Sequence, residues 1–266
     1  RQLIDHSNSL AFIFLIGLAV GSFVNVVAYR LPRGRGILKG RSACPHCQRQ
    51  IKGYDLIPLA SFIVLGGRCR FCQKPLSWQY PLVELYSGFI FLASFWLWGQ
   101  PSAGSVLAGW LFSVFILEVF LILFLTDLQH LILPDAVILA GLIGAVIYKI
   151  GVNDFSRFDL AAGAFYLAVL TGVWLISKGR WLGLGDAKLM GLVGFVFGFL
   201  PATAIFYLAV LAGGATGLVL LWLKRATLKS KLPFGSFLAL SVSLFVLTGF
   251  SWLGGFPWKS VLLIFK

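Results

Sequence analysis

The stretch VLAGWLFSVFILEVFLILFLTD, residues 106–127, is apolar almost throughout and holds only two charged side chains, Glu118 and Asp127. Crossing the hydrocarbon core of a bilayer takes about 20 apolar residues in helical form. The stretch therefore predicts a membrane-spanning helix that ends at Asp127, near one surface of the membrane. Acids within such helices are costly and usually face a cavity or a polar partner, so both acids are candidates for function.

The composition of the whole chain agrees with a membrane protein. Of its 266 residues, 59% are hydrophobic and 12% are charged, and the mean hydropathy is +0.92. A soluble domain has about a quarter charged residues. We therefore expect an all-α polytopic membrane protein of about eight transmembrane helices. The apolar runs lie at 10–29, 80–98, 105–126, 133–150, 159–178, 187–201, 203–223 and 234–255. Seven spans is the main alternative, because the sixth run is short and glycine-rich and is expected to end at Pro201.

The positive charges are confined to a few connecting segments. The net charge is +13, and 17 of the 22 Lys and Arg residues lie in segments 30–79, 178–188 and 224–231. Because basic loops stay on the cytoplasmic side, these three segments are expected to be cytoplasmic. This confinement argues against a nucleic-acid-binding face and predicts the lipid bilayer as the partner of the apolar surface. Residues 10–29 are too long for a removable signal peptide and predict a retained first span.

All four cysteines lie in the segment 30–79, as CPHC (Cys44, Cys47) and CRFC (Cys69, Cys72). Two Cys-x2-Cys pairs with 21 residues between them are typical of a four-thiolate zinc site. Free thiols or redox chemistry are the alternatives, and His46 could replace one cysteine. We expect three parts: a first helix at 1–29, a small cytoplasmic zinc-binding loop domain at 30–79, and a membrane bundle at 80–266.

Two of the nine acids, Asp127 and Asp186, are 59 residues apart in sequence but fall on the same membrane face in the expected topology. Two carboxylates in a poorly solvated site share a proton, so that one acts as a base and the other as an acid. In GLGD, the glycines at 183 and 185 would let a substrate backbone pass closely. Helix capping by Asp186 is the equally weighted alternative.

The other acids are expected to play lesser roles. Glu84 and Glu118 lie inside apolar runs, and each is expected either to face a cavity or to hydrogen-bond a neighbouring helix. Acids in or beside loops, including Asp55 and Asp159, are expected to be solvated.

The motifs occur in one order along nearly the whole chain: GSFVNVVAYRLP (21–32), the CxxC pairs, YPLVELYSG (80–88), TDLQHLILPD (126–135), GLGDAKLM (183–190) and PFGSFLAL (233–240). In this combination the chain resembles the type IV prepilin peptidases, bifunctional leader peptidases and N-methyltransferases of the GxGD aspartyl protease group. One departure is PFGSF, where PFGPF is more usual. We expect that Ser236 does not alter the chemistry.

The resemblance implies a reaction, its residues and its partners. Asp127 and Asp186 would be the catalytic pair, whereas Asp135 belongs to the motif without being a catalytic acid. The substrates would be type IV prepilins or pseudopilins, whose basic leader is cut at the cytoplasmic face of the bacterial inner membrane. The new N-terminal residue would then be methylated with S-adenosylmethionine, an activity associated with the cysteine-bearing loop.

The site of the methyl donor has no glycine-rich dinucleotide signature. Gly21, Asn25, Arg30 and Glu84 are motif positions near the cytoplasmic loop and are the candidates for binding S-adenosylmethionine. Helix packing is an equal alternative for Gly21, because small residues let membrane helices approach closely. Arg30 has the alternative role of anchoring the helix end at the lipid headgroups.

Two other classes of function are the alternatives to a peptidase. A proton-coupled transporter would place its acids near mid-bilayer and show inverted repeats, but Asp127 and Asp186 are expected at one face. A zinc-stapled scaffold for a secretion or pilus assembly would leave the paired acids and their glycines without a role.

Overall fold

The computed structural model describes the chain except residues 1, 38–39, 99–103, 226, 228–229 and 249–266. Its contacts divide the chain into two compact units, Arg1–Trp96 and Leu97–Lys266. We refer to them as unit 1 and unit 2. The division puts the helix at residues 80–96 with the cysteine-bearing loop, whereas the sequence grouped it with the bundle.

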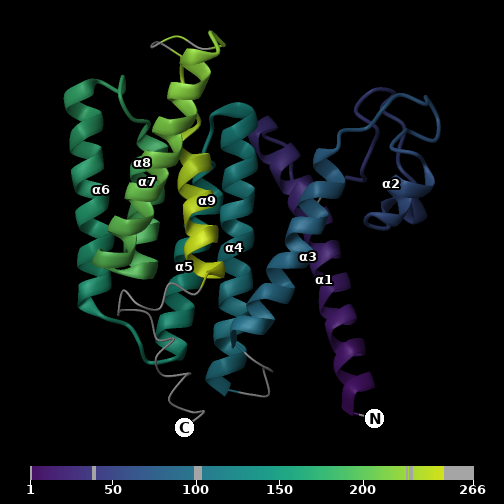
Figure 1. Ribbon diagram of the computed structural model, residues 1–266, viewed down its shortest axis with the longest axis horizontal. Coiled ribbons are helices and arrows are strands. Elements are labelled where there is room, and N and C mark those ends of the chain that lie inside the picture. The colour runs from purple at the N-terminus through teal and green to yellow at the C-terminus, as the bar shows by residue number, and fades with distance from the viewer. Residues whose placement is uncertain (1, 38–39, 99–103, 226, 228–229, 249–266) are drawn as a thin grey trace. The chain divides into compact units, whose positions relative to one another are not determined.

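Unit 1 consists of two long helices joined by the cysteine-bearing loop (Figure 1). The helices are α1 (Gln2–Arg30) and α3 (Gln79–Trp98), and the loop holds two 3₁₀ turns, η1 (Leu31–Arg33) and η2 (Gly53–Leu56), and the short helix α2 (Ala60–Val64). Small residues let α1 and α3 approach closely. A Cβ atom on Gly21 would lie 2.7 Å from Cβ of Ser87, whose hydroxyl donates to the carbonyl of Gly17 at 2.7 Å.

Unit 2 is a bundle of helices packed around a buried central one (Figure 1). The central helix is α7 (Leu184–Phe197), which contacts α5 (Asp135–Gly151), α6 (Arg157–Ser177), α8 (Phe199–Trp222) and α9 (Phe234–Leu247). The helix α4 (Gly104–His130) packs against α5 and α9. Within α7, Ala187, Leu189, Met190 and Val193 are fully buried, which explains how so short a helix is held.

The described residues confirm an all-α membrane protein. They form no strand beyond two isolated bridges, and each expected span coincides with a helix. Five segments are long and apolar enough to cross a membrane: Ser9–Arg33, Gln79–Trp98, Gly104–His130, Arg157–Ser177 and Phe199–Trp222. The count of eight spans is not confirmed, because α5, α7 and α9 have only 17, 14 and 14 described residues. The last part of the span expected at 234–255 lies outside the described residues.

The break between the sixth and seventh runs differs from the expected one. Pro201 was expected to end the sixth helix, but α7 already ends at Phe197 and Pro201 lies in the first turn of α8. Gly198 makes the break with a φ of 78°, a conformation that glycine adopts readily. Proline is tolerated in the first turn of a helix because the N–H groups there have no intrahelical acceptor, so its missing N–H costs no hydrogen bond.

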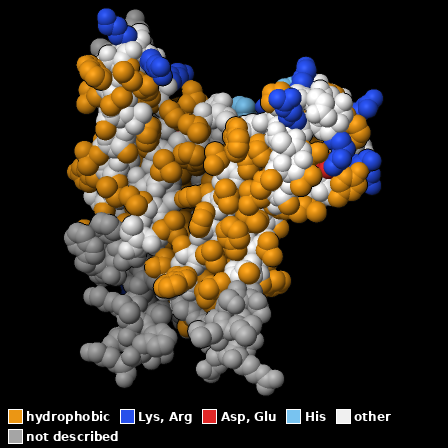
Figure 2. All heavy atoms as spheres, turned by 45° about the vertical axis from the view of Figure 1, so that its right-hand side comes forward, with side chains coloured by type: hydrophobic (Ala, Val, Ile, Leu, Met, Phe, Trp, Pro, Cys, Tyr) orange, Lys and Arg blue, Asp and Glu red, His pale blue; other side chains and the backbone are white. Residues whose placement is uncertain are grey.

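Figure 2 shows hydrophobic side chains on the sides of the helices, with Lys and Arg gathered over the loop of unit 1 and at one end of the unit 2 bundle. A buried ion pair joins α5 to α6: Lys149 Nζ lies 2.8 Å from Asp159 Oδ2, and the two side chains are 7% and 19% exposed. The expectation of a solvated Asp159 is therefore wrong, because α5 supplies it with a cation.

Candidate active site and metal centre

The four cysteine thiols of unit 1 converge on one point. The Sγ atoms of Cys44, Cys47, Cys69 and Cys72 all lie within 4.8 Å of one another, and those of Cys44 and Cys72 are 3.9 Å apart. Tetrahedral zinc with Zn–S bonds of about 2.3 Å requires an S···S separation of about 3.8 Å. The cluster can therefore bind a metal ion, and its spacing fits zinc.

Each Cys-x2-Cys pair is a tight turn built by the same two backbone hydrogen bonds. In the first, the N–H of Cys44 donates to the carbonyl of Arg49 at 3.0 Å, and the N–H of Gln48 donates to the carbonyl of Cys44 at 2.9 Å. The second turn repeats both bonds around Cys69 at the same distances. In that turn, backbone N–H groups that point at the sulfur lower the pKa of the Cys69 thiol to about 7, which favours the thiolate that a metal binds.

His46, the alternative ligand, is exposed and lies outside the cluster. Its Nε2 atom lies 3.3 Å from the carbonyl oxygen of Pro75, so the group that could hold a metal consists of the four cysteines.

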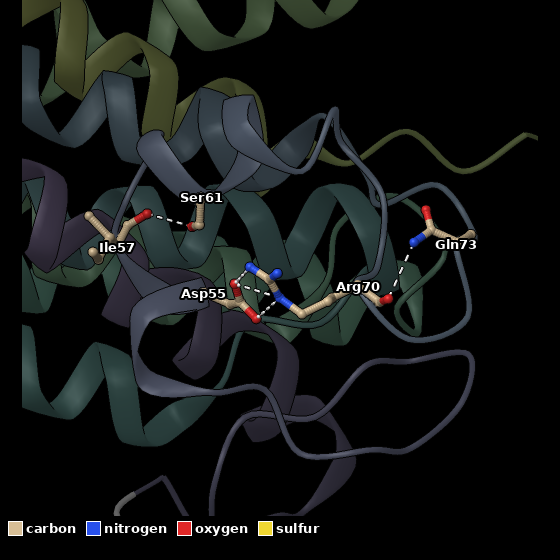
Figure 3. Close-up of polar contacts among 5 residues, drawn as sticks. All are labelled: Asp55, Ile57, Ser61, Arg70 and Gln73. Carbon is tan, nitrogen blue, oxygen red and sulfur yellow. Dashed lines mark hydrogen bonds and ion pairs between the residues drawn. The ribbon is translucent and has the colours of Figure 1, made fainter.

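An ion pair ties the second cysteine turn to the segment between the turns (Figure 3). Arg70 grips Asp55 with two nitrogens: Nη2 lies 2.6 Å from Oδ1 and Nε lies 2.9 Å from Oδ2. The hydrogen bond from the Arg70 guanidinium holds the pKa of Asp55 below its usual value. Asp55 was expected to be solvated, but its side chain is only 5% exposed, because η2 places it under this arginine.

A cavity of about 500 Å³ opens between the end of α1, the loop and the start of α3, all within unit 1. That volume is in the range of small-molecule sites. Three of the four residues suggested for the methyl donor line it, whereas Gly21 lies at the α1–α3 contact instead. The polar and aromatic side chains in the lining include Asn25, Tyr29, Tyr80 and Phe62, the acids Asp55 and Glu84, and the cations Arg30, Arg35 and Arg41.

Asn25, which lines this cavity, carries a buried acceptor. Its amide nitrogen donates to the carbonyls of Tyr80 and Gly21 at 3.2 and 3.3 Å. The residue is 4% exposed, and its Oδ1 atom is buried without a hydrogen-bond partner among the described residues. A buried acceptor without a partner is costly, and a donor group of a bound ligand would satisfy it.

Glu84 and Arg30 hold the loop around the cavity. Glu84 Oε2 accepts a hydrogen bond from the backbone N–H of Leu59 at 2.9 Å, and Leu59 has a φ of 58°. Arg30 donates to the carbonyls of Ile37 and Gly40 at 3.0 and 2.9 Å. Glu84 thus both hydrogen-bonds the loop and lines the cavity. Arg30 binds the chain that leads to the first cysteine turn.

In unit 2, Asp127 lies near the end of α4 and caps another helix. The residue is 5% exposed, and its Oδ2 atom accepts the backbone N–H of Ser236 at 2.6 Å and the Ser236 hydroxyl at 3.0 Å. Ser236 lies in the first turn of α9, where backbone N–H groups have no intrahelical partner and favour an anion. The sequence placed Ser236 in a motif but did not indicate this contact.

Asp186 lies in the first turn of α7. Its Oδ2 atom accepts the N–H of Gly183, the N-cap residue, at 3.1 Å. The capping role that the sequence left open is therefore present, and it leaves the other carboxylate oxygen for further contacts. A Cβ atom on Gly183 would lie 3.1 Å from the same Oδ2, so a side chain there would crowd the carboxylate.

The residues beside both aspartates meet at Leu133. A Cβ atom on Gly185 would lie 3.1 Å from Leu133 Cβ, and one on Gly235 would lie 2.9 Å from Leu133 Cδ1 and 3.1 Å from Asp127 Oδ2. Packing around one leucine thus brings together two acids that are distant in sequence.

Asp135, the third acid of this region, is paired. Both of its carboxylate oxygens accept from Lys188 Nζ, at 2.7 and 2.8 Å. The pair links the start of α5 to the first turn of α7, two residues from Asp186. Asp135 is 72% exposed in its side chain, which agrees with a role other than catalysis.

Comparison with known proteins places both units in one family. Residues 15–98 match the bacterial peptidase A24 N-terminal domain, and residues 112–218 match the type IV leader peptidase family. The chain belongs to the type IV leader peptidase family. The segment matched to this family contains both Asp127 and Asp186.

Curated relatives in this family resemble the chain over most of its length. A prepilin leader peptidase/N-methyltransferase of Burkholderia pseudomallei is 33% identical, over 86% of this chain and 82% of the relative. Proteins of the same name from Pseudomonas aeruginosa and Aeromonas hydrophila are 31% and 30% identical, over 90% and 87% of this chain and 92% and 88% of their own lengths. No solved structure matches the chain.

Proposed function

We propose that the chain is a membrane aspartyl endopeptidase that cleaves the basic leader of a type IV prepilin or pseudopilin and then N-methylates the new N-terminal residue. The observation that carries the proposal is the pair Asp127 and Asp186, held at helix ends beside glycines in the part of the chain that matches the type IV leader peptidase family.

The two carboxylates would have different roles in hydrolysis, one as the base and the other as the acid. One takes a proton from a water molecule as the water oxygen bonds to the scissile carbonyl carbon. The other gives its proton to the amide nitrogen as the C–N bond breaks. Gly183 leaves the Asp186 carboxylate uncrowded, whereas Gly185 lets Leu133 pack closely beside it.

The charge pattern supports a cytoplasmic position for this site in the bacterial inner membrane. The basic segment 224–231 precedes α9, whose first turn donates a hydrogen bond to Asp127 through Ser236. Lys178 and Arg180 lie in the connection that leads to α7. Basic connections of this kind stay in the cytoplasm. A prepilin leader, itself basic, would also stay on the cytoplasmic side, so its cleavage point would lie on the same membrane face as the two carboxylates.

The cavity of unit 1 is the proposed site for S-adenosylmethionine, which supplies the methyl group. Asn25 Oδ1 would accept a hydrogen bond from the bound molecule. Tyr29 and Tyr80 offer ring faces, and Glu84 offers a carboxylate, to its positively charged sulfonium. Arg30 would hold the loop closed, and Gly21 would permit the α1–α3 contact that positions Glu84.

Zinc is the proposed metal of the four-cysteine cluster, with a structural role. Four thiolates complete a tetrahedral shell and leave no open position for a substrate. The loop holds few buried apolar side chains, so a metal would supply the stability that a small core cannot.

Mass spectrometry of a co-expressed prepilin tests the proposal. The wild-type chain should remove the leader and add one methyl group to the new N-terminus. Asp127→Asn and Asp186→Asn should each leave the leader in place while the enzyme remains in the membrane fraction. Cleavage retained in either variant would refute the pair.

A further inference from the structure

Asp127 and Asp186 are held differently, and the difference lies in Ser236. Asp127 Oδ2 accepts two hydrogen bonds from this residue, at 2.6 and 3.0 Å. Asp186 Oδ2 accepts one backbone N–H, at 3.1 Å. Hydrogen bonds donated to a carboxylate favour its ionised form, so the two acids are not equivalent before substrate arrives.

The bonds from Ser236 are directed mainly at Asp127. Its N–H also lies 3.2 Å from the carbonyl of Pro233, and its hydroxyl lies 3.2 Å from the carbonyl of Phe124. In both cases the oxygen of Asp127 is the nearer acceptor. Since both bonds end on Oδ2, Oδ1 is the oxygen of Asp127 that is available to a water molecule.

Few other ionisable groups lie on the helices that pack around Asp127. On the packed helices, α9 carries no charged residue among those described, and α5 carries Asp135 and Lys149. Lys149 is bound to Asp159, and Lys188 of α7 is bound to Asp135. On α4 itself, Glu118 and His130 lie about two and a half turns and about one turn from Asp127. Asp186 of α7 is the carboxyl group that would share a proton with Asp127 in the proposed pair.

We propose that Ser236 is a positioning residue that keeps Asp127 ionised, and so assigns Asp127 as the base and Asp186 as the acid of the proposed peptidase. This inference rests on the proposed function of the pair. Asp127 Oδ1 takes the proton of the attacking water, and Asp186 gives its proton to the leaving amide nitrogen. After release of both products, Asp127 loses its proton to water and Asp186 takes one up, which restores the starting state.

In the type IV prepilin peptidases, proline is more usual at position 236. Proline has neither a backbone N–H nor a hydroxyl, so it could donate neither of the two hydrogen bonds that Ser236 donates to Asp127. The sequence-based expectation that Ser236 does not alter the chemistry is therefore open to a direct test. Because proline is tolerated in the first turn of a helix, Ser236→Pro is expected to fold and to shift the pH dependence of cleavage rather than abolish it.

The experiment measures kcat/KM for leader cleavage against pH, with the full-length enzyme in detergent and a purified prepilin. A hydrogen bond to a charged group corresponds to about one pH unit in the ionisation of that group. The acid limb of the profile should therefore move up by about one unit in Ser236→Pro and by less in Ser236→Ala. Ser236→Thr keeps both donors and should restore the wild-type limb.

Ser243→Ala is the matched control, since Ser243 is buried on the same helix and its hydroxyl donates to the carbonyl of Ala239, one turn earlier. Its profile should coincide with that of the wild type. An unmoved acid limb in Ser236→Pro overturns the inference, and so does a shift of the alkaline limb alone, which would make Asp127 the acid. Asp127→Asn distinguishes a failure of the proposed function from a failure of the inference about Ser236. Activity in that variant refutes the proposed function, whereas inactivity together with an unmoved Ser236→Pro profile refutes only the role of Ser236.

Discussion

In unit 1 the candidate residues are held by loop backbone, whereas in unit 2 they are held by the ends of helices. The cysteine turns repeat one pattern of backbone bonds, and Arg30 and Glu84 fasten the loop through its carbonyl and N–H groups. In unit 2, Asp127 caps α9 and Asp186 lies in the first turn of α7. Because each unit contains all of its own candidate residues, the proposed cleavage and methylation should be separable by mutation.

The largest effect is expected from the aspartates of unit 2. Asp186→Asn should reduce leader cleavage by at least about a thousandfold, because a neutral amide cannot transfer the proton. The same variant should still methylate a synthetic peptide that begins with the mature N-terminus, since the methyl-donor cavity lies in unit 1. Methyl transfer to this peptide is measured by mass spectrometry. Loss of both activities in a folded variant would show that the two sites are one.

Much of this comparison could be predicted from the sequence. The apolar runs located the helices, and the Cys-x2-Cys spacing located the metal cluster, because both signals are local in sequence. The bond between Asp127 and Ser236 could not be predicted, since it joins residues 109 positions apart across a helix contact. The same is true of Arg70 with Asp55, where the cysteine turns decide which acid the arginine meets. Pro201 was misjudged because its effect depends on whether it lies at the start or the end of a helix.

Removal of the metal should affect unit 1 alone. A chelator, or Cys69→Ser, is expected to remove the tetrahedral shell and with it the order of the loop that lines the cavity. Methylation of the mature peptide should then fall at least about tenfold, as is usual for disturbed metal sites, while leader cleavage persists. Metal content by elemental analysis and the two activities are measured on the same sample. Loss of cleavage with methylation retained would reverse the assignment of the units.

A smaller effect is expected at the acceptor of Asn25. Asn25→Ala removes the buried Oδ1 that has no partner among the described residues. The KM for S-adenosylmethionine should rise about fivefold, since one hydrogen bond contributes about 1 kcal/mol, and leader cleavage should not change. Ser94→Ala is the control, because Ser94 is fully buried on α3 but does not line the cavity. An equal change in both variants would mean that the loss is one of helix packing.

The smallest effect is expected from the ion pair between Arg70 and Asp55, which tests how firmly the loop backbone alone holds unit 1. Arg70 is 42% exposed, so solvent screens the pair and its contribution to stability is small. The lowered pKa of Asp55 means that this contribution is present above the unfolded pKa of about 3.9 and is lost as the pH falls through the folded value. At pH 7, Arg70→Gln should therefore release metal to a chelator only about two- to threefold more readily than the wild type, since exposed ion pairs contribute little. A release tenfold faster or more would show that the side-chain pair, and not the repeated backbone turns, holds the cysteines in place.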